Sequence, residues 1–137
     1  MGKVLGARGR RGRRLALLAA PVALLAAGCN VDLGSLGGTD ARGLGVNDAG
    51  VVVGFARDAD DQMHAFRKEP GAQMVDLNGD AERSSADAVN AAGVAVGYVV
   101  EGDAPAWQDT SAVAWQPDGT RVDLGLGVPS SANAIND

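Results

Sequence analysis

The stretch NDAGVVVGF at residues 47–55 decides the fold that we expect for this chain. It combines a turn with a short apolar strand, because Asn, Asp and Gly favour tight turns and valine favours strands. The stretch returns in altered form as NAAGVAVGY at residues 90–98, 43 positions later, and begins again as Asn136-Asp137 after a further 46 positions. Self-similarity over such a period is typical of repeat architectures.

A second phrase, Val-Asp-Leu, repeats with nearly the same spacing. It occurs at residues 31–33, 75–77 and 122–124, at intervals of 44 and 47 positions. Because two separate motifs share one period, the whole unit repeats. We therefore divide the chain into repeats over about 31–74 and 75–121, with a partial repeat over 122–137.

Each complete repeat contains four stretches with strand character. In the first repeat we expect a glycine-rich loop at 34–39 and strands at 41–46, 51–56, 63–68 and 73–77, with Gly54 marking a close approach of a neighbouring backbone. In the second repeat we expect strands at 86–89 and 94–99, one containing 113–115, and one at 120–124. Four strands with short connections make a meander of the size of a propeller blade. The predicted fold class is all-β: tandem four-stranded antiparallel meanders, propeller-like, in about two and a third repeats.

The first 28 residues differ from the rest and predict a lipoprotein signal peptide, with an N-terminal signal helix. Six cations fall within residues 1–14, an apolar run covers 15–27, and the string Leu-Ala-Ala-Gly-Cys ends at Cys29. This string resembles the lipobox of bacterial lipoproteins, which implies cleavage before Cys29 and lipidation of its thiol and amine. Residues 29–137 would then form the exported β-repeat domain. Arg13-Arg14 leaves twin-arginine export open beside the ordinary secretory route.

The distribution of charge also separates the predicted signal peptide from the rest of the chain. All 17 acidic residues follow residue 31, where only six of the twelve Lys and Arg residues remain, which gives that part a net charge of about −11. A strongly acidic surface repels phosphate, so we expect no nucleic-acid partner. The single cysteine excludes a disulfide within the chain.

The repeats resemble the HAF family of extracellular repeat proteins, named for a His-Ala-Phe step that stands here at residues 64–66. Similar phrases are DLG with LGG at residues 32–38, and VNDAG with VVG at residues 46–54. In the second repeat we place Val113-Ala114-Trp115 opposite this step, and Asn78 replaces the glycine of DLG. The resemblance implies an exported β-repeat protein and no particular reaction.

Two and a third repeats are few for this architecture, because each repeat buries its apolar faces against its neighbours. Three explanations remain open. The chain is a truncated copy, it completes the fold by self-association, or its repeats form a small stack of sheets with exposed edges.

The residues that could act in catalysis or ligand binding also have structural explanations. His64 lies in a repeated strand, so we interpret it as structural. Asp58, Asp60 and Asp61 form an acidic tip, with Asn78 and Asp80 on another loop, but their spacing matches no calcium-binding motif. Asp48 is interpreted as a turn former, and residues 34–38 as a turn rather than a phosphate-binding loop.

The recurring aspartates of Val-Asp-Leu, namely Asp32, Asp76 and Asp123, are expected to accept hydrogen bonds from backbone N–H groups between strands. Trp115 is expected in the core, in the position of Phe66. Trp107, in the long connection of the second repeat, is the better candidate for a binding platform.

The function predicted from the sequence is that of an exported, lipid-anchored, non-catalytic surface or interaction module, with no cofactor and no metal. Its predicted partners are the membrane, through the lipid on Cys29, and a second copy or missing repeats that complete the fold. The alternatives are a fragment of a carbohydrate-active propeller enzyme and a truncated copy without independent function.

Overall fold

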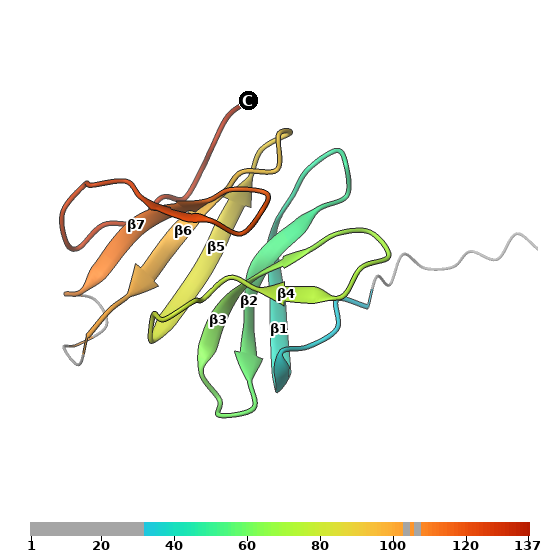
Figure 1. Cartoon of the computed structure of the whole chain (residues 1–137), viewed down its shortest axis with the longest axis horizontal. Helices are drawn as coiled ribbons and strands as arrows, with labels where there is room; N and C mark the ends of the chain where they lie inside the picture. Colours follow the sequence, from blue (N-terminus) through green and yellow to red (C-terminus); the bar gives the residue numbers. More distant parts are fainter. Residues whose placement is uncertain (1–31, 103–104, 106–107) are drawn as a thin grey trace, which may run out of the picture. The chain divides into compact units, whose positions relative to one another are not determined.

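The computed structural model describes residues 32–102, 105 and 108–137. The predicted signal peptide, Cys29 and Trp107 lie outside these residues. Every regular element in the described part is a β-strand, and none is a helix, which confirms the predicted all-β class. The strands form two four-stranded antiparallel sheets, each a simple meander (Figure 1).

The first sheet has the strand order β1-β2-β3-β4. Its strands are β1 (Gly37–Val46), β2 (Val52–Asp58), β3 (Met63–Lys68) and β4 (Met74–Asp76). The second sheet has the order β5-β6-β7-β8. Its strands are β5 (Arg83–Val89), β6 (Ala95–Val100), β7 (Thr110–Trp115) and β8 (Arg121–Asp123). The strands lie close to their predicted positions, except that β1 begins inside the stretch expected to be a glycine-rich loop.

The two sheets share one register. Gly54 pairs with Phe66 in the first sheet, and Gly97 pairs with Val113 in the second. A Cβ atom at Gly54 would lie 1.9 Å from the carbonyl oxygen of Arg42, and one at Gly97 would lie 2.0 Å from that of Ser85. Only glycine fits where the first strand of each sheet bulges against the second, as predicted for Gly54.

This shared register corrects one sequence alignment. Phe66 corresponds to Val113, so the His-Ala-Phe step of β3 corresponds to residues 111–113 of β7 rather than to residues 113–115. Trp115 therefore stands at the position of Lys68, not of Phe66. A shift by two residues keeps every side chain on the same face of a strand, so alternation of polar and apolar residues could not reveal the error.

The turns form as the sequence predicts. In the first, the backbone N–H of Gly50 donates to the Asn47 carbonyl (2.9 Å), and the N–H of Val51 donates to Asn47 Oδ1 (3.0 Å). In the second, Val94 donates in the same way to Asn90 Oδ1 (2.9 Å). Gly50 has a φ of +79° and its equivalent Gly93 a φ of +82°, a conformation that glycine adopts at little cost.

The core lies between the two sheets, where β5 packs against β1, β2 and β3. Small residues dominate it, and Trp115 is its largest side chain, with 1% of its surface exposed. The core consists of Val51, Val53, Ala65, Leu77, Ala81, Ala86, Ala95, Val99, Val113 and Trp115, with Val89 packed against it.

Polar contacts join the sheets beside this core. The N–H of Ala65 on β3 donates to the hydroxyl of Ser84 on β5 (2.8 Å), and Arg67 Nη1 donates to the carbonyl of Gly93 (2.6 Å). Asn47 Nδ2 donates to the carbonyl of Asn90 (2.9 Å). Because these donors and acceptors are wholly or partly buried, they fix the position of one sheet on the other.

The C-terminal segment repeats these contacts on the second sheet. The N–H of Ala112 donates to the hydroxyl of Ser130 (2.9 Å), as Ala65 does to Ser84, and Asn90 Nδ2 donates to the carbonyl of Asn136 (3.3 Å). Ser130, Ala132 and Ile135 are half-buried there, at positions that correspond to Ser84, Ala86 and Val89. Residues 130–136 therefore continue the pattern by which β5 covers the first sheet.

Candidate functional site

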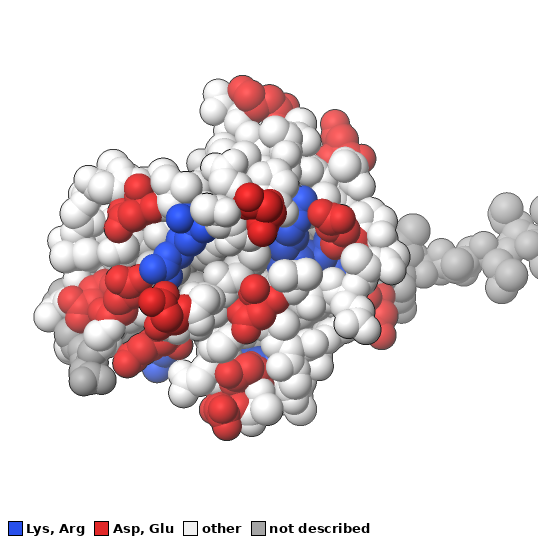
Figure 2. All heavy atoms as spheres, viewed as in Figure 1, with Lys and Arg blue, Asp and Glu red and all other residues white. Residues whose placement is uncertain are grey.

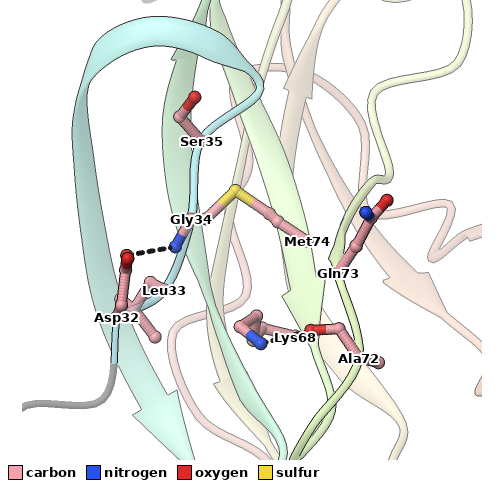
Figure 3. A pocket seen from close by; sticks show the side chains of 8 residues that line it. All are labelled: Asp32, Leu33, Gly34, Ser35, Lys68, Ala72, Gln73 and Met74. Carbon is pink, nitrogen blue, oxygen red and sulfur yellow. Dashed lines mark hydrogen bonds between the residues drawn. The ribbon is translucent and has the colours of Figure 1, made fainter.

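A cleft at the first sheet has a volume of about 400 Å³. It lies between the segment that precedes β1 and the hairpin that joins β3 to β4 (Figure 3). The residues that line it are Asp32, Leu33, Gly34, Ser35, Lys68, Ala72, Gln73 and Met74. Leu33 and Met74 supply apolar surface, whereas Asp32 and Lys68 supply opposite charges, so the cleft is amphipathic.

Local hydrogen bonds shape both walls of this cleft. Asp32 Oδ1 accepts from the N–H of Gly34 (2.8 Å), which has a φ of +77° and turns the segment toward Met74. On the opposite wall, Lys68 Nζ donates to the carbonyl of Ala72 across the hairpin. The ammonium group is therefore held against its own hairpin, and the space in front of Leu33 stays open (Figure 3).

The second sheet has an equivalent but smaller cleft of about 240 Å³. It is lined by Asp76, Leu77, Asn78, Gly79, Asp80, Gly119 and Arg121. Asp76 Oδ1 accepts from the N–H of Asn78 (2.7 Å), as Asp32 does from Gly34. The decisive difference is Trp115 at the position of Lys68: its indole is buried and Nε1 donates to the carbonyl of Leu77 (3.0 Å).

The recurring aspartates accept hydrogen bonds from backbone N–H groups, as predicted, but the prediction that these groups lie between strands is wrong. The third, Asp123, accepts from the N–H of Gly125 (2.7 Å) in the same arrangement. The donor stands two residues ahead in the same segment and not on a neighbouring strand, so these carboxylates form Asx turns. A turn explains why the aspartate recurs, without a catalytic role.

His64 on β3 contacts the last residues of both neighbouring strands, β2 and β4. Its Nδ1 lies 2.8 Å from Asp76 Oδ2, and its Nε2 lies 3.5 Å from Asp58 Oδ2. The imidazole thus joins the β2–β3 tip to β4, in agreement with a structural role. The corresponding residue of β7 is Ser111.

The acidic tip at residues 58–61 is organised as a turn. Asp58 Oδ1 accepts from the N–H groups of Asp60 and Gln62, both at 2.9 Å. Asp61 has a φ of 63° and pairs with Arg57 (3.3 Å). These bonds agree with a solvated turn.

The other oxygen-bearing residues considered as calcium ligands have partners of their own. Asn78 donates to the carbonyl of Ala81 and accepts from the Ser84 hydroxyl, and Asp80 lies 3.5 Å from Arg121. Within the described residues, no group of three or more His, Cys, Asp or Glu side chains is arranged to hold a metal ion.

The asparagine turns of successive repeats meet at a concavity of about 300 Å³. Asp48 and Asp137, from the first and the partial third repeat, both border it. Such convergence is what an enzyme with paired carboxylates would need. However, Asp137 Oδ1 already accepts from the N–H of Ala91 (2.7 Å), so we interpret Asp137 as a link between repeats.

Two pKa shifts lie away from the clefts, on β5 and β6. Burial raises the pKa of Asp87 above its ordinary value, and a hydrogen bond from Ser85 opposes this rise. Burial also raises the pKa of Tyr98, the nearby Asp87 carboxylate adds to the rise, and Arg83 lowers it. The pair favours a neutral Tyr98 and disfavours the charged form of Asp87.

Acidic side chains are spread over the face of the molecule that Figure 2 shows, with a few Lys and Arg side chains between them. Among the described residues, no helix has the length and apolar character needed to cross a membrane. Comparisons of the chain with models of protein families, with curated proteins and with solved structures gave no match. The site must therefore be interpreted from its own geometry.

Sequence reasoning missed both clefts. The repeated Val-Asp-Leu phrase marked the aspartates that border them but not their Asx turns, and the exchange of Lys68 for Trp115 was hidden by the misaligned strand. The connection between β6 and β7 is five residues longer than the one between β2 and β3, and this difference in length could have revealed the misalignment.

Proposed function

We propose that this protein is a non-catalytic interaction module, exported and anchored by lipid at Cys29, with propeller-like blades related to HAF repeats. The observation that carries the proposal is the repeated contact between successive units. The second sheet contacts the first through Ser84, Ala86 and Asn90. Equivalent contacts to the second sheet come one repeat later from Ser130, Ala132 and Asn136. A module built to accept one sheet after another is suited to binding another β-sheet.

The proposed partner is a second copy of this chain. Residues 130–136 lie on the second sheet in the manner of β5, yet no strand among the described residues pairs with them as β6 pairs with β5. Such an unpaired segment is a template for strand addition. The exposed apolar side chains of Leu126 and Val128 lie in the chain just before it.

Sedimentation velocity of the full chain in detergent tests the partner. We expect a reversible, concentration-dependent dimer or larger assembly that Ile135→Asp abolishes, because Ile135 is half-buried in the contact. Leu126→Asp is the matched control, since Leu126 is 67% exposed and lies outside the segment. A wild-type chain that stays monomeric at every concentration, or an Ile135→Asp chain that assembles like the wild type, contradicts the proposal.

The anchor has a separate test. Mass spectrometry of the membrane fraction should find acylated Cys29 as the first residue, and Cys29→Ser should release the protein from the membrane. Recovery of the chain with Met1 to Gly28 still attached and an unmodified thiol would refute the anchor.

A further inference from the structure

We propose that the cleft of the first sheet binds a flat aromatic group that carries an N–H donor, such as an indole. None of the residues that line the cleft belongs to the segment 130–136, so this proposal is independent of the self-association described above. It follows from the comparison of the two sheets, because Trp115 of the second sheet already places an indole N–H on the carbonyl of Leu77, which lines the second cleft.

The equivalence of the clefts rests on three matches. Asp32 and Asp76 form the same Asx turn, Leu33 and Leu77 follow them, and Lys68 and Trp115 occupy the same register position. Lys68 pairs with Met74 as Trp115 pairs with Arg121. The walls of the two clefts are thus built from corresponding backbone.

The second cleft shows what its walls accept. The Trp115 ring is packed in the core, and its N–H is satisfied by the Leu77 carbonyl at 3.0 Å. In the first cleft the corresponding acceptor is the carbonyl of Leu33, and no hydrogen bond among the described residues ends on it. An indole bound in the first cleft would supply a ring like that of Trp115 and an N–H donor for the Leu33 carbonyl.

The side chains around the first cleft suit an aromatic ring. The Leu33 side chain provides apolar contact, and the Met74 sulfur, which lies beside Gly34 in Figure 3, favours aromatic neighbours. The Lys68 ammonium borders the same space and favours a ring face over a second cation. A volume of about 400 Å³ lies within the range of sites for small molecules.

Charge argues against the other ligand classes. An anion would approach the Asp32 carboxylate, and a cation would approach Lys68, so neither gains from both walls. A neutral ring with one donor avoids both conflicts. We therefore name an indole or a similar neutral aromatic amine as the ligand class.

The test is an NMR titration of the full chain in detergent with indole, and with benzene as the probe that lacks a donor. We expect saturable shifts at the amides of Leu33, Gly34 and Met74, and smaller shifts at Leu77 and Gly119. The tripeptide Gly-Trp-Gly distinguishes a free small molecule from a tryptophan side chain of a peptide, since only a site open to peptides will bind it.

Lys68→Trp should fill the cleft and weaken indole binding by at least about tenfold, whereas Lys68→Ala leaves the cleft open and should retain binding. Failure of wild-type protein to bind indole saturably overturns the proposal, and so does equal binding by a folded Lys68→Trp variant. If Lys68→Trp does not fold, the location of the shifts in the wild type decides: shifts spread over both clefts, or absent from the first, reject the site.

Discussion

The first and second sheets have the same topology, register and turns, yet equivalent positions in the two sheets differ in burial. At one equivalent position the first sheet carries Lys68, partly exposed and bonded to its own hairpin, and the second carries Trp115, buried and bonded to Leu77. Trp115 is buried in the core between the two sheets, whereas within the described residues no further sheet covers Lys68 in this way. The difference shows that the topology of a sheet and the burial of its faces depend on different residues.

Replacement of Trp115 should have the largest effect on this comparison. We expect Trp115→Ala to cost about 3–5 kcal/mol in the free energy of unfolding, because it empties the core and leaves the Leu77 carbonyl without a donor. The equivalent change Lys68→Ala should cost less than about 0.5 kcal/mol, as for a surface residue. Chemical denaturation of both variants measures the contrast, and equal losses would mean that the two positions are not differently buried.

The shared register predicts the next largest effect. Gly97→Ala should destabilise the protein by about 2–3 kcal/mol, since the new Cβ would fall 2.0 Å from the Ser85 carbonyl oxygen. Gly71→Ala is the control: its φ is +73° and nothing lies within 4 Å, so backbone strain alone should cost about 1–2 kcal/mol. Thermal unfolding curves that place Gly71→Ala below Gly97→Ala in stability would contradict the close approach.

The asparagine turns give a smaller effect that acts between units. Asn90→Ala removes the acceptor for the Val94 N–H and the donor to Asn136, and we expect a loss of about 1–2 kcal/mol. Hydrogen exchange should also become faster in residues 130–137. Asp48→Ala, in the neighbouring turn position of the first sheet, should leave both quantities nearly unchanged, and a similar loss there would assign the effect to the turn as a whole.

The smallest effect depends on pH. Because burial raises the pKa of Asp87 in the folded chain, ionisation of this carboxyl opposes folding as the pH rises above its unfolded value. Asp87→Asn should therefore stabilise the protein at neutral pH by less than about 1 kcal/mol, after allowance for solvent screening. This gain should fade near pH 3, where Asp87 is protonated in both states.

The chain itself supplies a precedent for Asp87→Asn. The corresponding residue of the C-terminal segment is Asn133, which accepts from the Ser131 hydroxyl (3.2 Å) as Asp87 does from Ser85 (2.7 Å). Urea unfolding of wild type and variant between pH 3 and 7 checks the prediction. A constant difference over this range would show that the carboxyl charge is not its cause.

The sequence predicts much of the fold for a physical reason: its turns and close approaches depend on residues with unusual backbone freedom. The sequence predicts a close backbone approach at Gly54 and a turn at Asn47 and Gly50, and the structure has both. The contacts between the sheets could not be predicted in this way. The alignment of Trp115 and the donation from Arg67 to Gly93 depend on how two sheets meet, which alternation along one strand does not encode.

The residues of chemical interest divide in the same way. The repeated phrase of three residues predicted that Asp32 and Asp76 accept from backbone N–H groups, but it placed these groups between strands, whereas both aspartates form local Asx turns. The cleft in front of Leu33 joins segments more than thirty positions apart, so no local pattern announces it. Cys29 and Trp107 lie outside the described residues, and their roles stay predictions.

The asparagine turns stand at one end of each sheet, and the tips between the second and third strands stand at the opposite end. The β6–β7 connection is five residues longer than its counterpart, yet the registers on both sides of it match. Residues can thus be inserted at the tips without moving the asparagine turns that join one sheet to the next. Such a scaffold lets its loops diversify independently of its stability, so new specificities can be gained there by insertion alone.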